Sequence, residues 1–87
     1  MPETGSSWFV YIILCNDGSL YTGISTDIEK RLEKHKLGKG AKYTRSRGVK
    51  EIVFSEPFED RASASAREHE IKSLTHSQKL QLISKVI

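Results

Sequence analysis

The longest apolar run of the chain, Trp8 to Cys15, has apolar residues at both odd and even positions. A strand of this composition is apolar on both faces, which is typical of a central strand covered from two sides. Asn16, Asp17 and Gly18 follow, and they predict a three-residue hairpin loop with Gly18 in the left-handed conformation. The pattern therefore predicts a central strand that turns tightly into a second strand over residues 19–24.

The length of this loop decides where two tyrosines lie. A three-residue loop makes Tyr11 face Gly23, so that Tyr11 and Tyr21 become diagonal neighbours on one face. A two-residue turn at Asp17-Gly18 would shift the pairing by one residue and place the tyrosines on opposite faces. With the longer loop, Gly23 leaves space beside the ring of Tyr11 for a ligand or another stretch of backbone.

The next segment carries the signals of a helix. Thr26-Asp27-Ile28-Glu29 is a capping box at its start, and Gly38 ends it after about residue 36 or 37. Ile28 and Leu32 mark its core side. Residues 38–50 are basic and rich in glycine, and we interpret them as a loop of about 12 residues, a length usually found in functional or mobile loops.

Two further helices follow a third strand at residues 52–54. Asp60 caps a helix from Asp60 to about Ser73, and Thr75-His76-Ser77-Gln78 is a second capping box. It opens a last helix with Leu80 and Ile83 facing inward. The order is β-β-α-β-α-α, an α+β domain over residues 1–87 with a flexible lead-in at about residues 1–7.

Composition limits the classes of protein. A chain of 87 residues allows one domain with a modest core, and 37% apolar against 29% charged residues is a globular balance rather than a disordered one. No apolar run approaches the roughly 20 residues of a membrane span, and the N-terminus lacks a signal-peptide pattern. The single cysteine, Cys15, is interpreted as a small buried residue and is compatible with the reducing cytoplasm, where we expect the protein.

Positive charge is concentrated in one segment. Residues 30–50 hold nine of the fourteen Lys and Arg but only one acid, whereas residues 51–60 hold four acids and no base. Such a basic segment suits a phosphate backbone, although a solvated loop with lysines for solubility explains it equally well. The candidate contacts to nucleic acid are Lys39, Lys42, Tyr43, Arg45 and Arg47.

Arg31 and His35 are four residues apart on the first predicted helix, so they project from one stripe beside its core side. A guanidinium offers fixed donors to phosphate oxygens, and an imidazole donates a hydrogen bond or moves a proton. The plainer interpretation is a surface arginine beside a partly packed histidine.

Glu68 lies between Ala64 and Ile71 on the apolar stripe of the second predicted helix. An unpaired carboxylate in a core position is costly, so it requires a partner. Either a salt bridge to Arg31 or Arg67, or one divalent cation such as Mg²⁺, satisfies it.

Tyr11 and Tyr21, each taken alone, are packing residues of a strand. Hydrolysis of a phosphodiester needs a deprotonated water, neutralised charge on the phosphoryl group and a stabilised leaving oxygen, which a phenol, a cation and a metal supply together. A phenol with a pKa near 10 is only about 0.1% ionised at pH 7. A tyrosine base therefore needs a nearby positive charge, from Arg31 or from the basic segment.

From about Phe9 to Ile83 the chain resembles the GIY-YIG nuclease module in its small, stand-alone form. The first triplet reads Phe9-Val10-Tyr11 in place of Gly-Ile-Tyr, and no asparagine follows Asn16, whereas many members carry an active-site asparagine. Gln78 or Lys79 is the candidate replacement. The segments that carry the resemblance are Val10-Tyr11-Ile12, Tyr21-Thr22-Gly23-Ile24-Ser25, Arg31-x-x-x-His35, Gly38 to Arg45 and Ala64-x-x-x-Glu68-x-x-Ile71-Lys72.

The resemblance implies a three-stranded antiparallel sheet flanked by helices, and metal-dependent hydrolysis of DNA. It implies Tyr11 as general base or water-orienting group, assisted by Tyr21. Arg31 and His35 would contact the scissile phosphate and support proton movement. Glu68 would bind one Mg²⁺ or Mn²⁺, held weakly until substrate arrives.

The expected function is a structure-selective or weakly specific DNA endonuclease in repair or processing, acting on DNA that includes branched or damaged forms. No separate DNA-recognition domain is present in the sequence. Two alternatives remain: a catalytically idle module that grips phosphates through the basic segment, and a subunit whose target choice lies in a partner protein. No membrane partner is expected, and the sequence does not define the oligomeric state.

Overall fold

The computed structural model describes residues 7–84, so the lead-in predicted at about residues 1–7 lies outside it except for Ser7, whose N–H donates to the Phe58 carbonyl at 3.1 Å. The chain forms, in order, β1 (Trp8–Cys15), β2 (Leu20–Ser25), α1 (Ile28–Lys36), α2 (Lys42–Arg47), β3 (Val49–Phe58), α3 (Arg61–Lys72) and α4 (His76–Ser84). None of the helices within residues 7–84 is long and apolar enough to cross a membrane.

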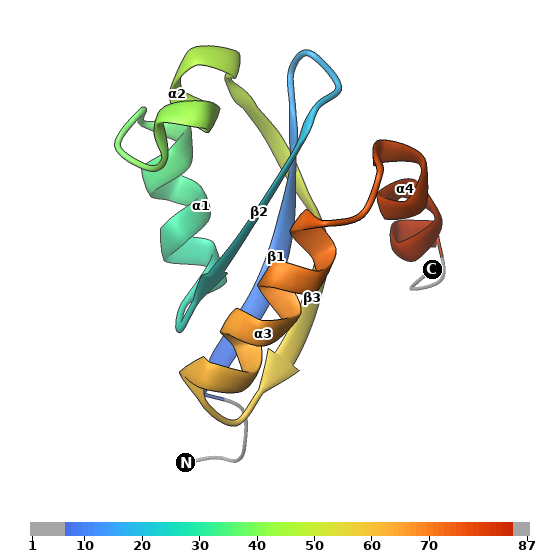
Figure 1. Cartoon of the computed structure of the whole chain (residues 1–87). Coiled ribbons are helices and arrows are strands. Elements are labelled where there is room, and N and C mark those ends of the chain that lie inside the picture. The colour runs from blue at the N-terminus through green and yellow to red at the C-terminus, as the bar shows by residue number, and fades with distance from the viewer. Residues whose placement is uncertain (1–6, 85–87) are drawn as a thin grey trace.

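The three strands form one antiparallel sheet in the order β2-β1-β3, so the predicted central position of β1 is confirmed. Figure 1 shows α1 and α2 on one side of the sheet and α3 and α4 on the other. The predicted α+β domain with a three-stranded antiparallel sheet and flanking helices is therefore confirmed, with one additional short helix.

Two clusters of buried side chains lie on the two faces of β1, since successive residues of a strand point to opposite sides. Val10 and Ile12 pack on one face with Leu20, Phe54, Ala64 and Ile71, covered by α3 and α4. On the other face Tyr11, Ile13 and Cys15 pack with Tyr21, Ile28, Leu32, Tyr43, Val49 and Ile52. The core side predicted for α1 at Ile28 and Leu32 is thus confirmed.

The hairpin between β1 and β2 has the three-residue loop. Tyr11 pairs with Gly23 and Ile13 with Tyr21, and Gly18 has a φ of 86°, in the left-handed region. The rings of Tyr11 and Tyr21 consequently lie on one face with their centroids 6.5 Å apart.

The region interpreted as a loop of about 12 residues differs from the expectation. It contains α2, and β3 begins at Val49 rather than at residue 52. The prediction of a long loop was wrong. Helix α2 has only six residues and glycines close to both ends, so it is too short to show an amphipathic pattern in the sequence.

Helix ends follow side-chain caps, as expected, with one shift. Thr75 and Gln78 form the predicted reciprocal capping box, at 2.9 and 3.1 Å, and the Asp60 carboxylate accepts from the Ser63 N–H at 2.8 Å. In α1, however, the cap is Asp27 rather than Thr26, and its Oδ1 accepts from the Lys30 N–H at 3.1 Å.

The last helix also departs from the prediction. Leu82 and Ile83 pack on the core, whereas Leu80 is 47% exposed. The inward position of Ile83 is confirmed and that of Leu80 is wrong, because the core-facing side of α4 is one residue pair, Leu82 and Ile83, rather than a stripe of spacing three.

The cap of α1 gives the first testable prediction. Asp27→Ala should lower the free energy of unfolding by about 1 kcal/mol, since the Lys30 N–H loses its acceptor. Thr26→Ala, one residue earlier, should leave stability nearly unchanged. Urea unfolding of both variants measures the difference, and an equal loss in the two would contradict the assignment of the cap.

Candidate active site

A cleft of about 400 Å³ brings together four of the five predicted catalytic side chains. Tyr11 from β1, Tyr21 from β2, Arg31 from α1 and Glu68 from α3 all line it. Because α1 and α3 lie on opposite sides of the sheet, the cleft is lined from both faces of the edge strand β2. Its lining is completed by Trp8, Gly23, Ile24, Arg61 and Ser65.

His35, the fifth predicted catalytic residue, lies behind Tyr11. Its side chain is 2% exposed and does not line the cleft, and its Nε2 is 3.1 Å from the Tyr11 hydroxyl. The resemblance implied a direct contact between His35 and a scissile phosphate, whereas the structure places His35 against Tyr11 and Tyr21, outside the lining of the cleft.

Thr44 of α2 fixes the other side of the imidazole. Its Oγ1 lies 2.7 Å from His35 Nδ1 and donates to the Ala41 carbonyl at 3.0 Å. Because the single hydroxyl proton is used for Ala41, the hydroxyl accepts from Nδ1–H. The competing contact, from the Ala41 N–H to Nδ1, is 3.4 Å and hence weak. We therefore assign the proton of neutral His35 to Nδ1, which makes Nε2 the acceptor for the Tyr11 O–H.

Two glycines make room for this pair. A Cβ on Gly23 would come within 2.6 Å of the Tyr11 hydroxyl oxygen, and a Cβ on Gly40 would collide with the ring of His35. The place of a Cβ at Gly23 is therefore taken by the end of the Tyr11 ring, while Gly23 and Tyr11 both line the cleft where a ligand would bind. Gly40, in the segment before α2, has the same relation to His35.

The protonation of Tyr11 is shifted away from the phenolate. Burial raises the pKa of Tyr11 above its usual 10.0, and the nearby guanidinium of Arg31 offsets only part of this effect. The positive charge that the sequence analysis required beside a tyrosine base is present, but it does not ionise the phenol. A neighbouring proton acceptor is needed instead, and His35 Nε2 is in that position.

His35 is held neutral. Burial lowers the pKa of His35 below its usual 6.5, and the positive charge of Arg31 acts in the same direction. The Tyr11 and His35 side chains are therefore both uncharged at neutral pH, with one shared hydrogen bond between them.

Arg31 is half-buried in the wall of the cleft. Its Nε is buried and has no hydrogen-bond partner within residues 7–84. A buried donor without a partner is uncommon in folded proteins, and in this cleft a water, an ion or a ligand can supply the acceptor.

Glu68 lies at the edge of the buried face of α3 and is partly exposed. Its side chain is 20% exposed, between the fully buried Ala64 and Ile71, and its Oε2 is 3.0 Å from Lys72 Nζ. The expectation that this carboxylate requires a partner is met by Lys72 rather than by Arg31 or Arg67.

A divalent cation fits this donor set to a limited degree. Glu68 is the single carboxylate lining the cleft, and within residues 7–84 no group of three His, Cys, Asp or Glu side chains gathers into a ready-made metal site. Mg²⁺ commonly takes one or two carboxylates and completes its shell with water and substrate phosphates. The cleft suits a cation that arrives with its substrate.

The predicted nucleic-acid contacts separate into two groups. Lys39, Lys42 and Arg45 are exposed and do not line the cleft. The other two are engaged within the protein: the Arg47 guanidinium lies 3.9 Å from the centroid of the Tyr43 ring, and its Nε is 3.2 Å from an oxygen of Asp17.

The suggested replacements for the missing asparagine are wrong. Gln78 is committed to the capping box of α4, where its Oε1 accepts from the Thr75 N–H at 2.9 Å, and neither Gln78 nor Lys79 lines the cleft. Figure 1 shows α4 near the C-terminal end of α3.

Sequence reasoning missed Trp8, Arg61 and Ser65, which also line the cleft. The Arg61 guanidinium lies 5.7 Å from the centroid of the Trp8 ring. A signal for two of them was present: Arg61, Ser65 and Glu68 follow one another at offsets of four and three, which is one stripe of a helix.

Comparisons with known proteins show the family of this chain. The family model described as the GIY-YIG catalytic domain matches residues 7–81. Membership follows directly: the chain belongs to the GIY-YIG catalytic domain family, a family of nucleases. Within that family its relatives are small stand-alone UPF0213 proteins.

A UPF0213 protein of Clostridium perfringens is 54% identical over 76 residues, which are 87% of this chain and 82% of that protein. Two solution NMR structures are also similar. The UPF0213 protein BH0048 from Bacillus halodurans has 47% identity and a TM-score of 0.57, covering 88% of this chain and 82% of its own. The protein EF2693 from E. faecalis has 42% identity and a TM-score of 0.61, covering 99% and 91%.

The buried histidine predicts a pH dependence of stability. The folded chain binds the His35 proton less readily than the unfolded chain, whose pKa is near 6.5. The free energy of unfolding should therefore fall as the pH drops below about 6.5, by at most about 1.4 kcal/mol per pH unit. Urea unfolding between pH 5 and 7.5 measures this. His35→Gln should remove the slope, and His69→Gln, at an exposed position, should keep it.

The tautomer of His35 has its own test. Thr44→Val keeps the shape of the side chain but leaves Nδ1–H buried without an acceptor, at a cost of about 1 to 3 kcal/mol. We expect the imidazole to move to the Nε2–H tautomer in this variant and to keep the Nδ1–H tautomer in Thr44→Ser. Nitrogen-15 NMR of the ring distinguishes them, and a protonated Nε2 in the unaltered protein at neutral pH would contradict the assignment.

Proposed function

We propose that this chain is a divalent-metal-dependent endonuclease that hydrolyses phosphodiester bonds of DNA with structure selectivity or weak sequence specificity. One observation carries the proposal: the hydrogen-bonded pair of Tyr11 and His35 opens onto a cleft that Arg31 and Glu68 also line. The whole chain serves as one catalytic module, in DNA repair or processing in the cytoplasm.

Tyr11 acts on the attacking water through a proton relay. The phenol takes a proton from the water while its own proton passes to Nε2 of His35, 3.1 Å away. The phenolate never has to form, which matters because burial raises the Tyr11 pKa. The Thr44 hydroxyl, 2.7 Å from Nδ1, accepts from the resulting imidazolium and holds the ring in place.

Arg31 and Glu68 act on the phosphate. The unpartnered Nε of Arg31 donates to a phosphate oxygen, where negative charge increases as the water attacks. Glu68 holds the divalent cation, Mg²⁺ or Mn²⁺, whose charge stabilises the same group when it is bound. Tyr21, 5.3 Å from His35 between the ring centroids, packs beside the pair and narrows its access to water.

A second candidate function is a nucleic-acid-binding module without catalytic activity. It is favoured by one observation, the ion pair between Glu68 and Lys72, because the only carboxylate of the cleft already has a cationic partner. That pair is weak where Lys72 is exposed, since surface ion pairs contribute little, and a divalent cation competes with it effectively.

The experiment is a cleavage panel with the purified full chain. Labelled branched, nicked and single-stranded DNA are incubated with Mg²⁺, Mn²⁺ or a chelator, and we expect cutting only with metal. Glu68→Gln should reduce the rate by about two orders of magnitude or more, since a bound metal contributes several kcal/mol. Glu70→Gln, two residues away on α3 with a side chain that is 68% exposed, is the matched control and should cut normally.

Each outcome decides between the candidates. Metal-dependent cutting that Glu68→Gln leaves unchanged would refute the metal assignment. Binding to all substrates without cutting in any metal would favour the second candidate.

A further inference from the structure

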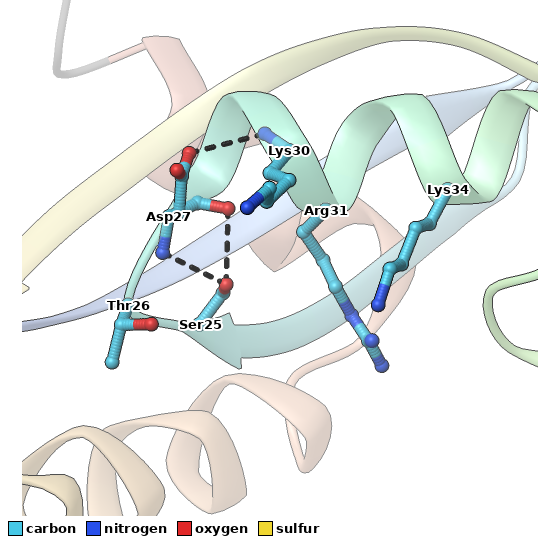
Figure 2. A pocket seen from close by; sticks show the side chains of 6 residues that line it. All are labelled: Ser25, Thr26, Asp27, Lys30, Arg31 and Lys34. Atoms are coloured by element: carbon cyan, nitrogen blue, oxygen red, sulfur yellow. Dashed lines mark hydrogen bonds between the residues drawn. The ribbon is translucent and has the colours of Figure 1, made fainter.

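A second hollow adjoins the cleft at the start of α1. It has a volume of about 170 Å³, several times the share of about 30 Å³ that one water takes in the liquid. Arg31 lines both this hollow and the cleft. Figure 2 shows Arg31 and Lys34 extending in the same direction from α1. The hollow is lined by Ser25, Thr26, Asp27, Lys30, Arg31 and Lys34.

The charges of this hollow favour an anion. Three of its six side chains are cations, Lys30, Arg31 and Lys34, and none of them forms an ion pair within residues 7–84. The single carboxylate, Asp27, is occupied in capping the helix, where it accepts from the Lys30 N–H. Since the cap already uses the helix N-terminus, the attraction for an anion comes from the side chains.

The acids of α1 lie elsewhere. Glu29 and Glu33 line a different hollow together with Leu32 and Lys36. The charged pairs four residues apart on this helix are consequently like-charged, Glu29 with Glu33 and Lys30 with Lys34, which is unfavourable for a helix by itself. Three of the four Lys and Arg of α1 therefore line the hollow next to the cleft, and only Lys36 lies with the acids.

We propose that this hollow, which we call the Lys30–Lys34 subsite, binds the phosphodiester directly next to the scissile one on the same DNA strand. The assignment rests on the proposed function. Arg31 provides the link, because a guanidinium has five N–H donors and can serve two neighbouring phosphates. Lys30 and Lys34 act as compact point charges on the second phosphate.

The subsite changes the path expected for the strand. The basic segment of residues 30–50 includes Lys30 and Lys34, but the contacts predicted from it were later in the chain. Of those, Lys39, Lys42 and Arg45 do not line either hollow, and Arg47 is engaged with Tyr43 and Asp17. The strand instead leaves the cleft along the first two turns of α1. Ser25, at the end of β2, and the next two residues, Thr26 and Asp27, also line this hollow.

The test couples protein charges to individual phosphates. Binding of a nicked DNA is measured with a chelator present, and a neutral methylphosphonate replaces one phosphate at a time around the nick. Four proteins are compared: the unaltered chain, Lys30→Gln/Lys34→Gln, Arg31→Gln, and the control Lys36→Gln/Lys50→Gln. The control removes the same charge, and Lys36 comes from the opposite side of the same helix.

We expect Lys30→Gln/Lys34→Gln to weaken binding about tenfold and to reduce the slope of log K against log salt by about 1, and the control to change little. At one position, the methylphosphonate should weaken DNA binding by the unaltered chain but not by Lys30→Gln/Lys34→Gln. Arg31→Gln should likewise abolish the effect of a methylphosphonate at a second position, the phosphate immediately next to the first.

Two results would overturn the subsite. One is an equal loss of binding in Lys30→Gln/Lys34→Gln and in the control, because binding would then depend on the net charge of the protein and not on where the lysines lie. The other is a scan in which no single phosphate is coupled to Lys30 and Lys34, or in which that phosphate is not adjacent to the one coupled to Arg31. The binding scan is done without metal and does not measure cleavage. If the unaltered chain cuts unmodified DNA in the cleavage panel, the proposed function therefore stands even when the subsite is refuted.

Discussion

A strand that is covered on both faces sends alternate side chains into two different environments, and β1 places the whole site by this rule. Val10 and Ile12 enter an apolar core, whereas Tyr11, Ile13 and Cys15 enter a second one beneath α1 and α2. A shift of one residue would exchange the two sets. The three-residue hairpin loop prevents that shift, so the position of the Tyr11 phenol depends on the loop that follows β1.

The second core is unusual because it contains a chain of polar groups. Tyr11, His35 and Thr44 are all at most 2% exposed, yet they are joined by hydrogen bonds from the phenol to the Ala41 carbonyl. Burial of such groups is costly unless every donor and acceptor is used. With the proton of His35 assigned to Nδ1, every group of this chain has a hydrogen-bond partner, and a proton acceptor lies behind the phenol. Packing and acid-base chemistry are thus set by the same contacts.

The sequence predicted those features that depend on local rules. The hairpin register followed from Gly18, and the caps of α3 and α4 from Asp60 and Thr75. It failed where distant residues decide. The burial of His35 depends on α2, which has six residues and no periodic pattern. The Glu68–Lys72 pair, by contrast, is local, four residues apart on one helix, and the sequence analysis overlooked it in favour of Arg31 and Arg67. The family resemblance proposed five catalytic residues, but it did not separate the four that line the cleft from His35, which lies behind Tyr11.

The short helix α2 has a further consequence for the basic segment. Six residues are too few to hold a helix together in water, so α2 is ordered by what it touches. Those contacts are Thr44 on the imidazole and Tyr43 against Tyr21, whose ring centroids are 5.8 Å apart. Lys42 and Arg45 lie on the exposed side of the same helix. The imidazole therefore also holds α2 in place, and through Thr44 the exposed helix α2 is in direct contact with buried His35.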